Sequence, residues 1–176
     1  QEIIGTYYKP VIVHRDLKTK NVLVKSNMEC CLADFGLAVR YSSERNQIDF
    51  GKDRFKLSSI QEGSVRYMAP ECLKETLNMN SIEQLKKTDI YSYALIVWEL
   101  LSRFRIDNDE INEHRPAYYE FVQGDPPIEL MCDIVCIRKL RPSLKINYMT
   151  ASEVCELFTL HFHFHFRYFF FNFAFF

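Results

Sequence analysis

The pattern of hydrophobic and polar positions predicts short strands in the first part of the chain. Residues 11–13 are a β-branched run that follows Pro10, and they predict a buried strand. The apolar runs 22–24 and 31–33 flank a turn signal at 26–27, so they should pair as a β-hairpin.

Farther along, the pattern predicts a long loop and then helices. Residues 39–62 are polar and lack periodicity, and long loops in compact domains are usually functional. Residues 88–103 are apolar on nearly every side of a helix, with Thr88 or Asp89 as the cap, which predicts a helix buried at the centre of the domain. Residues 127–138 predict a second helix with one apolar face.

The end of the chain has a different composition. Residues 158–176 contain ten phenylalanines, with three histidines alternating among them at 161, 163 and 165. This run is short for a membrane span, which needs about 20 apolar residues. A metal site is not favoured, because no other ligand-type residues converge there. We interpret residues 158–176 as an aberrant, non-native tail.

Composition limits the classes of function. A length of 176 residues suffices for one domain with a hydrophobic core. The net charge of -1 gives no electrostatic reason to expect nucleic acid as a partner. The six cysteines contain no CxxC pair and are expected to be buried thiols. The chain starts with Gln1 instead of methionine, which suggests a fragment.

Three short motifs follow one another along residues 14–71. The segment His14-Arg15-Asp16-Leu17-Lys18-Thr19-Lys20-Asn21 matches the catalytic-loop pattern HRDLxxxN in full. Asp34-Phe35-Gly36 begins thirteen residues after Asn21, and Ala69-Pro70-Glu71 follows farther on. Each tripeptide alone arises by chance in many proteins, but all three in order indicate a kinase-like lobe.

The residue types in these motifs suit phosphoryl transfer, which depends on positioning and charge neutralisation. The Asp16 carboxylate can orient an attacking hydroxyl and accept its proton. Asn21 and Asp34 offer oxygen ligands suited to the Mg²⁺ that accompanies ATP. Lys18 is a point charge two residues from the candidate base. Arg15 has two alternative roles that the sequence leaves open: pairing with a phosphorylated loop residue, or a structural ion pair.

The sequence resembles the receptor serine/threonine kinases of the transforming growth factor β, activin and bone morphogenetic protein family. Residues 2–40, 66–71, 78–80 and 87–100 carry the resemblance. Lys18 and Ser64 are similar to the serine/threonine form of the kinase motifs, not the tyrosine form. The block 118–142 is more similar to type I than to type II receptors, whereas Phe35 and Ala94 resemble type II members.

This resemblance implies roles and partners. Asp16 would be the catalytic base, Lys18 would contact the ATP phosphate, and Asn21 and Asp34 would hold Mg²⁺, with Mn²⁺ as an alternative metal. The family implies a single-pass membrane receptor of which this segment is cytoplasmic, so that membrane contact comes only through a missing upstream segment. It also implies a partner receptor of the other type, type II if this chain is type I, and Smad proteins as substrates.

The expected fold is therefore α+β: the C-terminal lobe of a protein kinase, mainly helical with a small β-hairpin, and with the N-terminal lobe absent. Residues 1–157 would form a partial kinase domain and residues 158–176 the tail. No glycine-rich phosphate loop or ATP-pairing lysine is recognised, so the chain alone is expected to be inactive. The alternatives are a truncated, non-catalytic binding module or decoy, and a different kinase subfamily.

Overall fold

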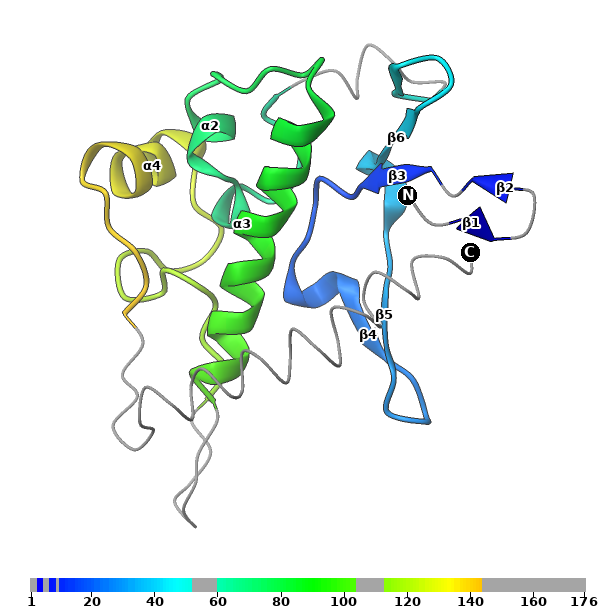
Figure 1. Ribbon diagram of the computed structural model, residues 1–176. Helices are drawn as coiled ribbons and strands as arrows, with labels where there is room; N and C mark the ends of the chain where they lie inside the picture. Colours follow the sequence, from blue (N-terminus) through cyan, green and yellow to red (C-terminus); the bar gives the residue numbers. More distant parts are fainter. Residues whose placement is uncertain (1–2, 5–6, 9, 52–59, 104–112, 144–176) are drawn as a thin grey trace, which may run out of the picture.

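The computed structural model describes residues 3–4, 7–8, 10–51, 60–103 and 113–143, with strands in the first part and helices in the second (Figure 1). The strands are β1 (Ile3–Ile4), β2 (Tyr7–Tyr8), β3 (Val11–Val13), β4 (Val22–Val24), β5 (Cys30–Leu32), β6 (Val39–Ser42) and β7 (Gln47–Asp49). The helices are α2 (Pro70–Leu73), α3 (Ile82–Leu101) and α4 (Ile128–Cys132). The short helical turns are the 3-10 turns η1 (Thr19–Asn21), η2 (Phe35–Leu37) and η3 (Val65–Tyr67), and the π-helical turn η4 (Asp133–Ile137).

The described strands form three antiparallel sheets, β1–β2, β3–β6–β7 and β4–β5. In the second sheet Val13 at the end of β3 lies opposite Val39 at the start of β6. Both valines are almost fully buried. Because the two strands run antiparallel, the segment that follows β3 and the segment that precedes β6 meet at one end of the sheet. Two of the three kinase-like motifs are thereby brought together.

Helix α3 is the central element of the helical part (Figure 1). The Ser81 side chain caps its N-terminus by accepting a hydrogen bond of 3.3 Å from the Gln84 backbone N–H. The buried core combines apolar residues from the β3–β6–β7 sheet, from α2 and α3, from α4 and η4, and from the segments between these elements. Its members are Val13, Val39, Ile48, Phe50, Met68, Ala69, Cys72, Leu73, Leu77, Leu85, Leu95, Ala117, Tyr118, Val122, Met131, Ile134, Val135 and Cys136.

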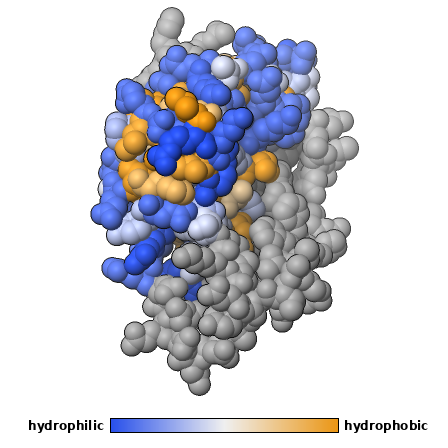
Figure 2. All heavy atoms as spheres, turned by 90° about the vertical axis from the view of Figure 1, so that its left-hand side faces the viewer, coloured by the Kyte–Doolittle hydropathy of each residue, from blue (hydrophilic) through white to orange (hydrophobic). Residues whose placement is uncertain are grey.

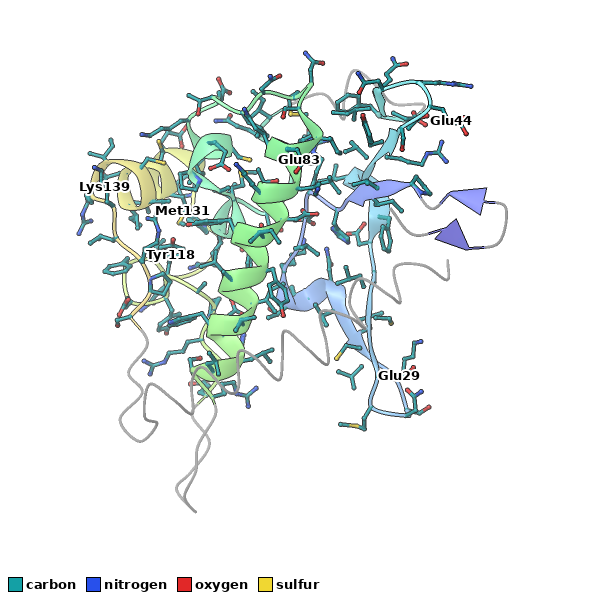
Figure 3. The ribbon with its side chains drawn as sticks, viewed as in Figure 1. Glu29, Glu44, Glu83, Tyr118, Met131 and Lys139 are labelled. Atoms are coloured by element: carbon teal, nitrogen blue, oxygen red, sulfur yellow. The ribbon has the colours of Figure 1, made fainter. Side chains whose placement is uncertain are left out.

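Helix α4 and the strands lie on opposite sides of α3 (Figure 1). Tyr118 and Met131 are fully buried on the α4 side (Figure 3). The outer surface there gathers hydrophobic side chains among hydrophilic ones (Figure 2). Leu130 of α4 and Ile137 of η4 are 39% and 71% exposed. On the strand side, Glu29 and Glu44 mark the tips of the β4–β5 and β6–β7 hairpins (Figure 3).

The expected fold class is wrong. A mainly helical lobe with one hairpin and no N-terminal lobe was predicted, but seven strands precede the first α-helix within the described residues. The chain thus opens with a β-rich, N-lobe-like region. The hairpin over residues 22–33 is present as β4–β5, and the strand at 11–13 is present as β3. The extra strands are only two to four residues long, so each carries too few positions to show an alternating pattern.

Other expectations need smaller corrections. The segment 39–62 is not all loop, because β6 and β7 form a hairpin within it. The central helix begins at Ile82 and ends at Leu101, so Thr88 and Asp89 lie inside it and do not cap it. The second helix is confirmed as α4 continued by η4. Cys30 is exposed, contrary to the expectation of buried thiols. The tail 158–176 and its three histidines lie outside the described residues.

Candidate active site

The segment after β3 is anchored to helix α3 by one buried carboxylate. Asp89 accepts hydrogen bonds from the backbone N–H groups of His14, at 2.7 Å, and Arg15, at 2.9 Å. Burial raises the pKa of Asp89, while the two backbone hydrogen bonds oppose that rise. Arg15 has a left-handed backbone with φ of 66°. A residue other than glycine holds this conformation only when its surroundings fix it, and Asp89 supplies that restraint.

The His14 ring links this segment to the residue before the second motif. Its Nδ1 accepts from the Asp16 backbone N–H at 3.3 Å, and its Nε2 lies 3.0 Å from the Ala33 carbonyl oxygen. A carbonyl can only accept and an amide N–H can only donate, so these contacts fit a neutral imidazole with its proton on Nε2. His14 is 1% exposed. The buried His14 ring therefore connects the segment 14–21 to the residue that precedes Asp34-Phe35-Gly36.

Three groups converge on the Asp16 carboxylate. Oδ1 accepts a hydrogen bond of 2.8 Å from the Ser64 backbone N–H. Oδ2 accepts from Lys18 Nζ at 2.7 Å and from Asn21 Nδ2 at 3.4 Å. Lys18 Nζ also donates to the Ser64 hydroxyl at 2.8 Å. Asp16 is 9% exposed, so its charge is fixed in orientation and only partly shielded by water.

The Asn21 side chain is oriented by the same residue. Its Nδ2 donates to the Asp16 carbonyl oxygen at 2.9 Å, and Asn21 is 6% exposed. With the nitrogen engaged in this way, the amide oxygen is the atom left to face a cation.

Asp34 is held beside this group without a direct hydrogen bond to it. The preceding residue, Ala33, donates its N–H to the Asn21 carbonyl oxygen at 2.9 Å and accepts from the His14 ring. Asp34 itself is exposed and has a left-handed backbone, with φ of 62° and ψ of 68°. Its Oδ1 accepts a long bond of 3.4 Å from the Gly36 N–H.

The donor set suits a hard cation. Asp34 offers a carboxylate and Asn21 an amide oxygen, which is the type of ligand that Mg²⁺ prefers, with one or two carboxylates completed by water and phosphate oxygens. Among the described residues no three His, Cys, Asp or Glu side chains gather as a metal-binding group. The two residues therefore fit a cation that takes most of its ligands from elsewhere.

A second buried carboxylate, Glu99 of α3, ties the third motif region to the first. Tyr67 OH donates to Glu99 Oε1 at 2.6 Å and lies 3.3 Å from Thr19 Oγ1. Burial, helped by the Glu99 hydrogen bond, raises the pKa of Tyr67, so the phenol stays protonated and keeps donating. Glu99 also accepts from the Ala117 N–H at 2.8 Å and lies 3.2 Å from His114 Nε2.

Arg66 fixes the same turn from the other side. Its guanidinium donates to the carbonyl oxygens of Ala117 at 2.7 Å, Val122 at 3.2 Å and Gly124. Burial lowers the pKa of Arg66. Together with Tyr67, this side chain holds turn η3, and hence Ser64, against the Asp16 carboxylate.

The structure thus brings Asp16, Lys18 and Asn21 into direct contact and places Asp34 next to them. Sequence reasoning missed Asp89 and Glu99. A usable signal existed for Glu99, which is a lone charged residue within the apolar run 95–101. The sequence predicts Asp89 as one of two possible helix caps, with Thr88 as the other. It carries no signal for the true partners of Asp89, which lie 75 and 74 residues away in the chain.

Comparison with known proteins agrees with this geometry. A family model described as "Protein kinase domain" matches residues 4–142. Activin receptor type-1 of Homo sapiens is 42% identical over 156 residues, which are 89% of this chain and 29% of that protein. TGF-beta receptor type-1 of Rattus norvegicus is 45% identical over 143 residues, 81% of this chain and 27% of that protein. The chain therefore spans less than a third of the length of these relatives.

These matches bear on two expectations. The resemblance to type I receptors is confirmed, since both relatives are type-1 receptors. The expected absence of an N-terminal lobe is contradicted, because the kinase-domain match already begins at residue 4, within the β-rich region. In the described part of the chain, no helix combines the length and apolar character needed to cross a membrane.

Proposed function

This chain belongs to the protein kinase domain family, and we propose that it is the catalytic part of a receptor-type serine/threonine kinase. The reaction would transfer the γ-phosphoryl group of ATP to serine or threonine hydroxyls of protein substrates. The observation that carries the proposal is the convergence of Lys18, Asn21 and the Ser64 backbone N–H on the Asp16 carboxylate.

In the proposed mechanism Asp16 is the general base. Its two oxygens are held in fixed directions, so the carboxylate can orient an incoming hydroxyl and accept its proton. The Lys18 ammonium lies 2.7 Å from this carboxylate, where it can balance charge on the transferring phosphoryl group. Its second bond, to the Ser64 hydroxyl, holds the ammonium beside Asp16. The similarity of Lys18 and Ser64 to the serine/threonine form of the kinase motifs supports serine or threonine substrates.

Asn21 and Asp34 are proposed to hold Mg²⁺ through their side-chain oxygens, with Mn²⁺ as an alternative metal. The metal, when bound, neutralises charge on the ATP phosphates. Asp34 suits this role because its carboxylate is exposed and, among the described residues, accepts just one long hydrogen bond, from the Gly36 N–H. Asn21 suits it because its nitrogen is already engaged by Asp16.

The likeness to type-1 receptors supports a finer proposal. The complete protein would be a single-pass membrane receptor in TGF-beta or activin signalling, with this chain on the cytoplasmic side, a type II partner receptor and Smad substrates. Residues 1–157 would belong to the kinase domain and residues 158–176 to a separate tail.

The test is magnesium-dependent phosphorylation of a serine-containing protein substrate by the complete natural protein. Asp16→Asn should lower kcat on the order of 10²–10⁴-fold, the usual contribution of a positioned general base. Asp34→Ala should abolish the dependence on magnesium together with activity. Glu44→Gln, at an exposed hairpin tip, is the matched control and should leave activity unchanged. Inactivity of the wild-type protein would refute the proposal and favour a non-catalytic binding module.

A further inference from the structure

A half-exposed histidine lies against the buried carboxylate of Glu99. His114 Nε2 is 3.2 Å from Glu99 Oε2. The His114 side chain is 49% exposed, whereas that of Glu99 is 1% exposed. One oxygen of this buried carboxylate therefore meets a group that reaches the protein surface.

The other oxygen of the same carboxylate faces inward. Glu99 Oε1 accepts hydrogen bonds from the Tyr67 hydroxyl at 2.6 Å and from the Ala117 N–H at 2.8 Å. The Tyr67 hydroxyl oxygen also lies 3.3 Å from Thr19 Oγ1, in the catalytic loop (residues 14–21). A continuous series of contacts thus connects His114 at the surface with Thr19 in the catalytic loop.

The Thr19–Tyr67 contact joins the two segments that surround the candidate base. Thr19 begins turn η1 and follows Lys18, whose Nζ donates to the Asp16 carboxylate at 2.7 Å. Tyr67 ends turn η3, and Ser64, the residue before that turn, donates its N–H to Asp16 at 2.8 Å. The Tyr67 hydroxyl therefore links the two segments from which Asp16 receives these hydrogen bonds, and Glu99 holds that hydroxyl in place.

The groups around the Glu99 carboxylate differ in how they respond to pH. Histidine changes its charge between pH 5 and 8. Burial raises the pKa of Tyr67, so its hydroxyl stays protonated over this range, and Arg66 on the same turn keeps its charge. The other charged side chains near the pair, on α3 and on the segment that contains His114, are exposed: Arg103, Glu113, Arg115 and Asp125. Among the described residues, His114 is therefore the group whose protonation changes the charge beside Glu99 near neutral pH.

Protonation of the His114 ring strengthens its contact with Glu99. In an imidazolium both ring nitrogens are donors, so Nε2 presents an N–H group to Glu99 Oε2, and the hydrogen bond is charge-assisted. In a neutral imidazole Nε2 is a donor in one tautomer and an acceptor in the other. In the second tautomer its lone pair would face the carboxylate oxygen. The carboxylate is therefore held more firmly when His114 is protonated.

We propose that His114 is a positioning residue for the catalytic loop: its protonation fixes the Glu99 carboxylate, which holds Tyr67 and, through Tyr67, the loop. Activity should then increase, relative to a protein that lacks this histidine, as the pH falls from about 8 to about 6. This inference rests on the proposed kinase function for its activity readout, but its structural readout does not.

The activity experiment compares the complete wild-type protein with His114→Gln and Glu113→Gln at several pH values. The ratio of the wild-type kcat to the His114→Gln kcat should fall about fivefold from pH 6 to pH 8, the upper scale of an ion pair with one exposed partner. KM for ATP should not change. Taking the ratio at each pH removes the pH dependence of the reaction itself. Glu113→Gln changes the adjacent exposed residue, and its ratio to the wild type should stay constant with pH.

The structural readout is the protection factor of the Asn21 amide, measured by hydrogen–deuterium exchange. This amide closes turn η1 through a 3.0 Å hydrogen bond to the Lys18 carbonyl oxygen. Its protection factor should fall about fivefold from pH 6 to pH 8 in the wild type and stay constant in His114→Gln. Tyr67→Phe removes the hydroxyl that contacts both Glu99 and Thr19, so it should also abolish the pH dependence.

Three results would overturn the inference. One is an equal pH dependence of Asn21 protection in the wild type and in His114→Gln. Another is a pH dependence that persists in Tyr67→Phe, and the third is a kcat ratio that does not vary with pH in an active protein. An inactive wild-type protein whose Asn21 amide shows the expected pH dependence refutes the proposed function and leaves the positioning role supported.

Discussion

Replacing Asp89 with asparagine should loosen the catalytic loop from helix α3. The wild-type carboxylate accepts two backbone hydrogen bonds, from His14 at 2.7 Å and from Arg15 at 2.9 Å. Asparagine keeps one acceptor oxygen and turns an N–H group toward the other backbone N–H. One hydrogen bond to a charged acceptor is lost, which is worth about 1.5–3 kcal/mol.

Part of this loss is offset. Burial raises the pKa of Asp89, so the wild-type protein bears a desolvation cost for the ionised form that asparagine does not bear. We therefore expect Asp89→Asn to lower the free energy of unfolding by about 2 kcal/mol, or about 30-fold in the ratio of folded to unfolded protein. Asp89→Ala loses both acceptors and should cost about twice as much.

The assay is urea denaturation of the complete protein, combined with hydrogen exchange of the His14 and Arg15 amides. Glu83→Gln is the control on the same helix, since Glu83 forms an exposed ion pair with Lys86 at 2.9 Å. Such pairs contribute about 0–1 kcal/mol. If Asp89→Asn shifts the urea midpoint no more than Glu83→Gln does, or leaves both amides equally protected, Asp89 does not anchor the loop.

Two further outcomes follow from local geometry. In thermal unfolding, Gly63→Ala should destabilise the protein more than Gly51→Ala does. Both glycines have positive φ, which costs other residues about 1–2 kcal/mol. At Gly63, in contrast to Gly51, the added Cβ would also lie 2.7 Å from a backbone oxygen. Equal costs would show that the segment relaxes freely. The hydrogen bonds from the Arg40 side chain and the Gly51 N–H lower the pKa of Asp49. In an NMR titration the pKa of this carboxylate should lie below the usual value of about 3.9. In Arg40→Gln the pKa of Asp49 should move toward that value. The stability that the Arg40–Asp49 pair contributes is present above about pH 3.9 and is lost as the pH falls through the pKa of Asp49 in the folded protein. An Asp49 pKa at the usual value would contradict this prediction.

The sequence predicts those parts of the site in which the contacting residues are close together in the chain. The contacts of Asp16 with Lys18 and Asn21 span two and five residues, so a motif of eight residues records them completely. A helix over residues 88–103 was predicted because a buried helix is apolar on nearly every side. Residues 82–87 were missed, since four of these six residues are polar or charged and only Ile82 and Leu85 are apolar. The other signal there is the capping pair Ser81 and Gln84.

The contacts that hold the motifs in place were not predictable in this way, for a physical reason. On helix α3, Asp89 contacts the catalytic loop and Glu99 contacts turn η3. Residues three to four positions apart share one face of a helix, so each contact involves a single acidic residue and leaves no run of residues as a signal. Seen along the sequence, each is one acidic residue in a helix, which could equally be a cap or a solvent-facing charge. Their role depends on backbone N–H groups elsewhere in the chain that donate to them: those of His14 and Arg15 for Asp89, and that of Ala117 for Glu99. A buried carboxylate is costly unless hydrogen-bond donors contact it. A lone acidic residue inside an apolar helix therefore predicts a hydrogen-bond donor nearby in the fold, although the sequence does not show which residue supplies it.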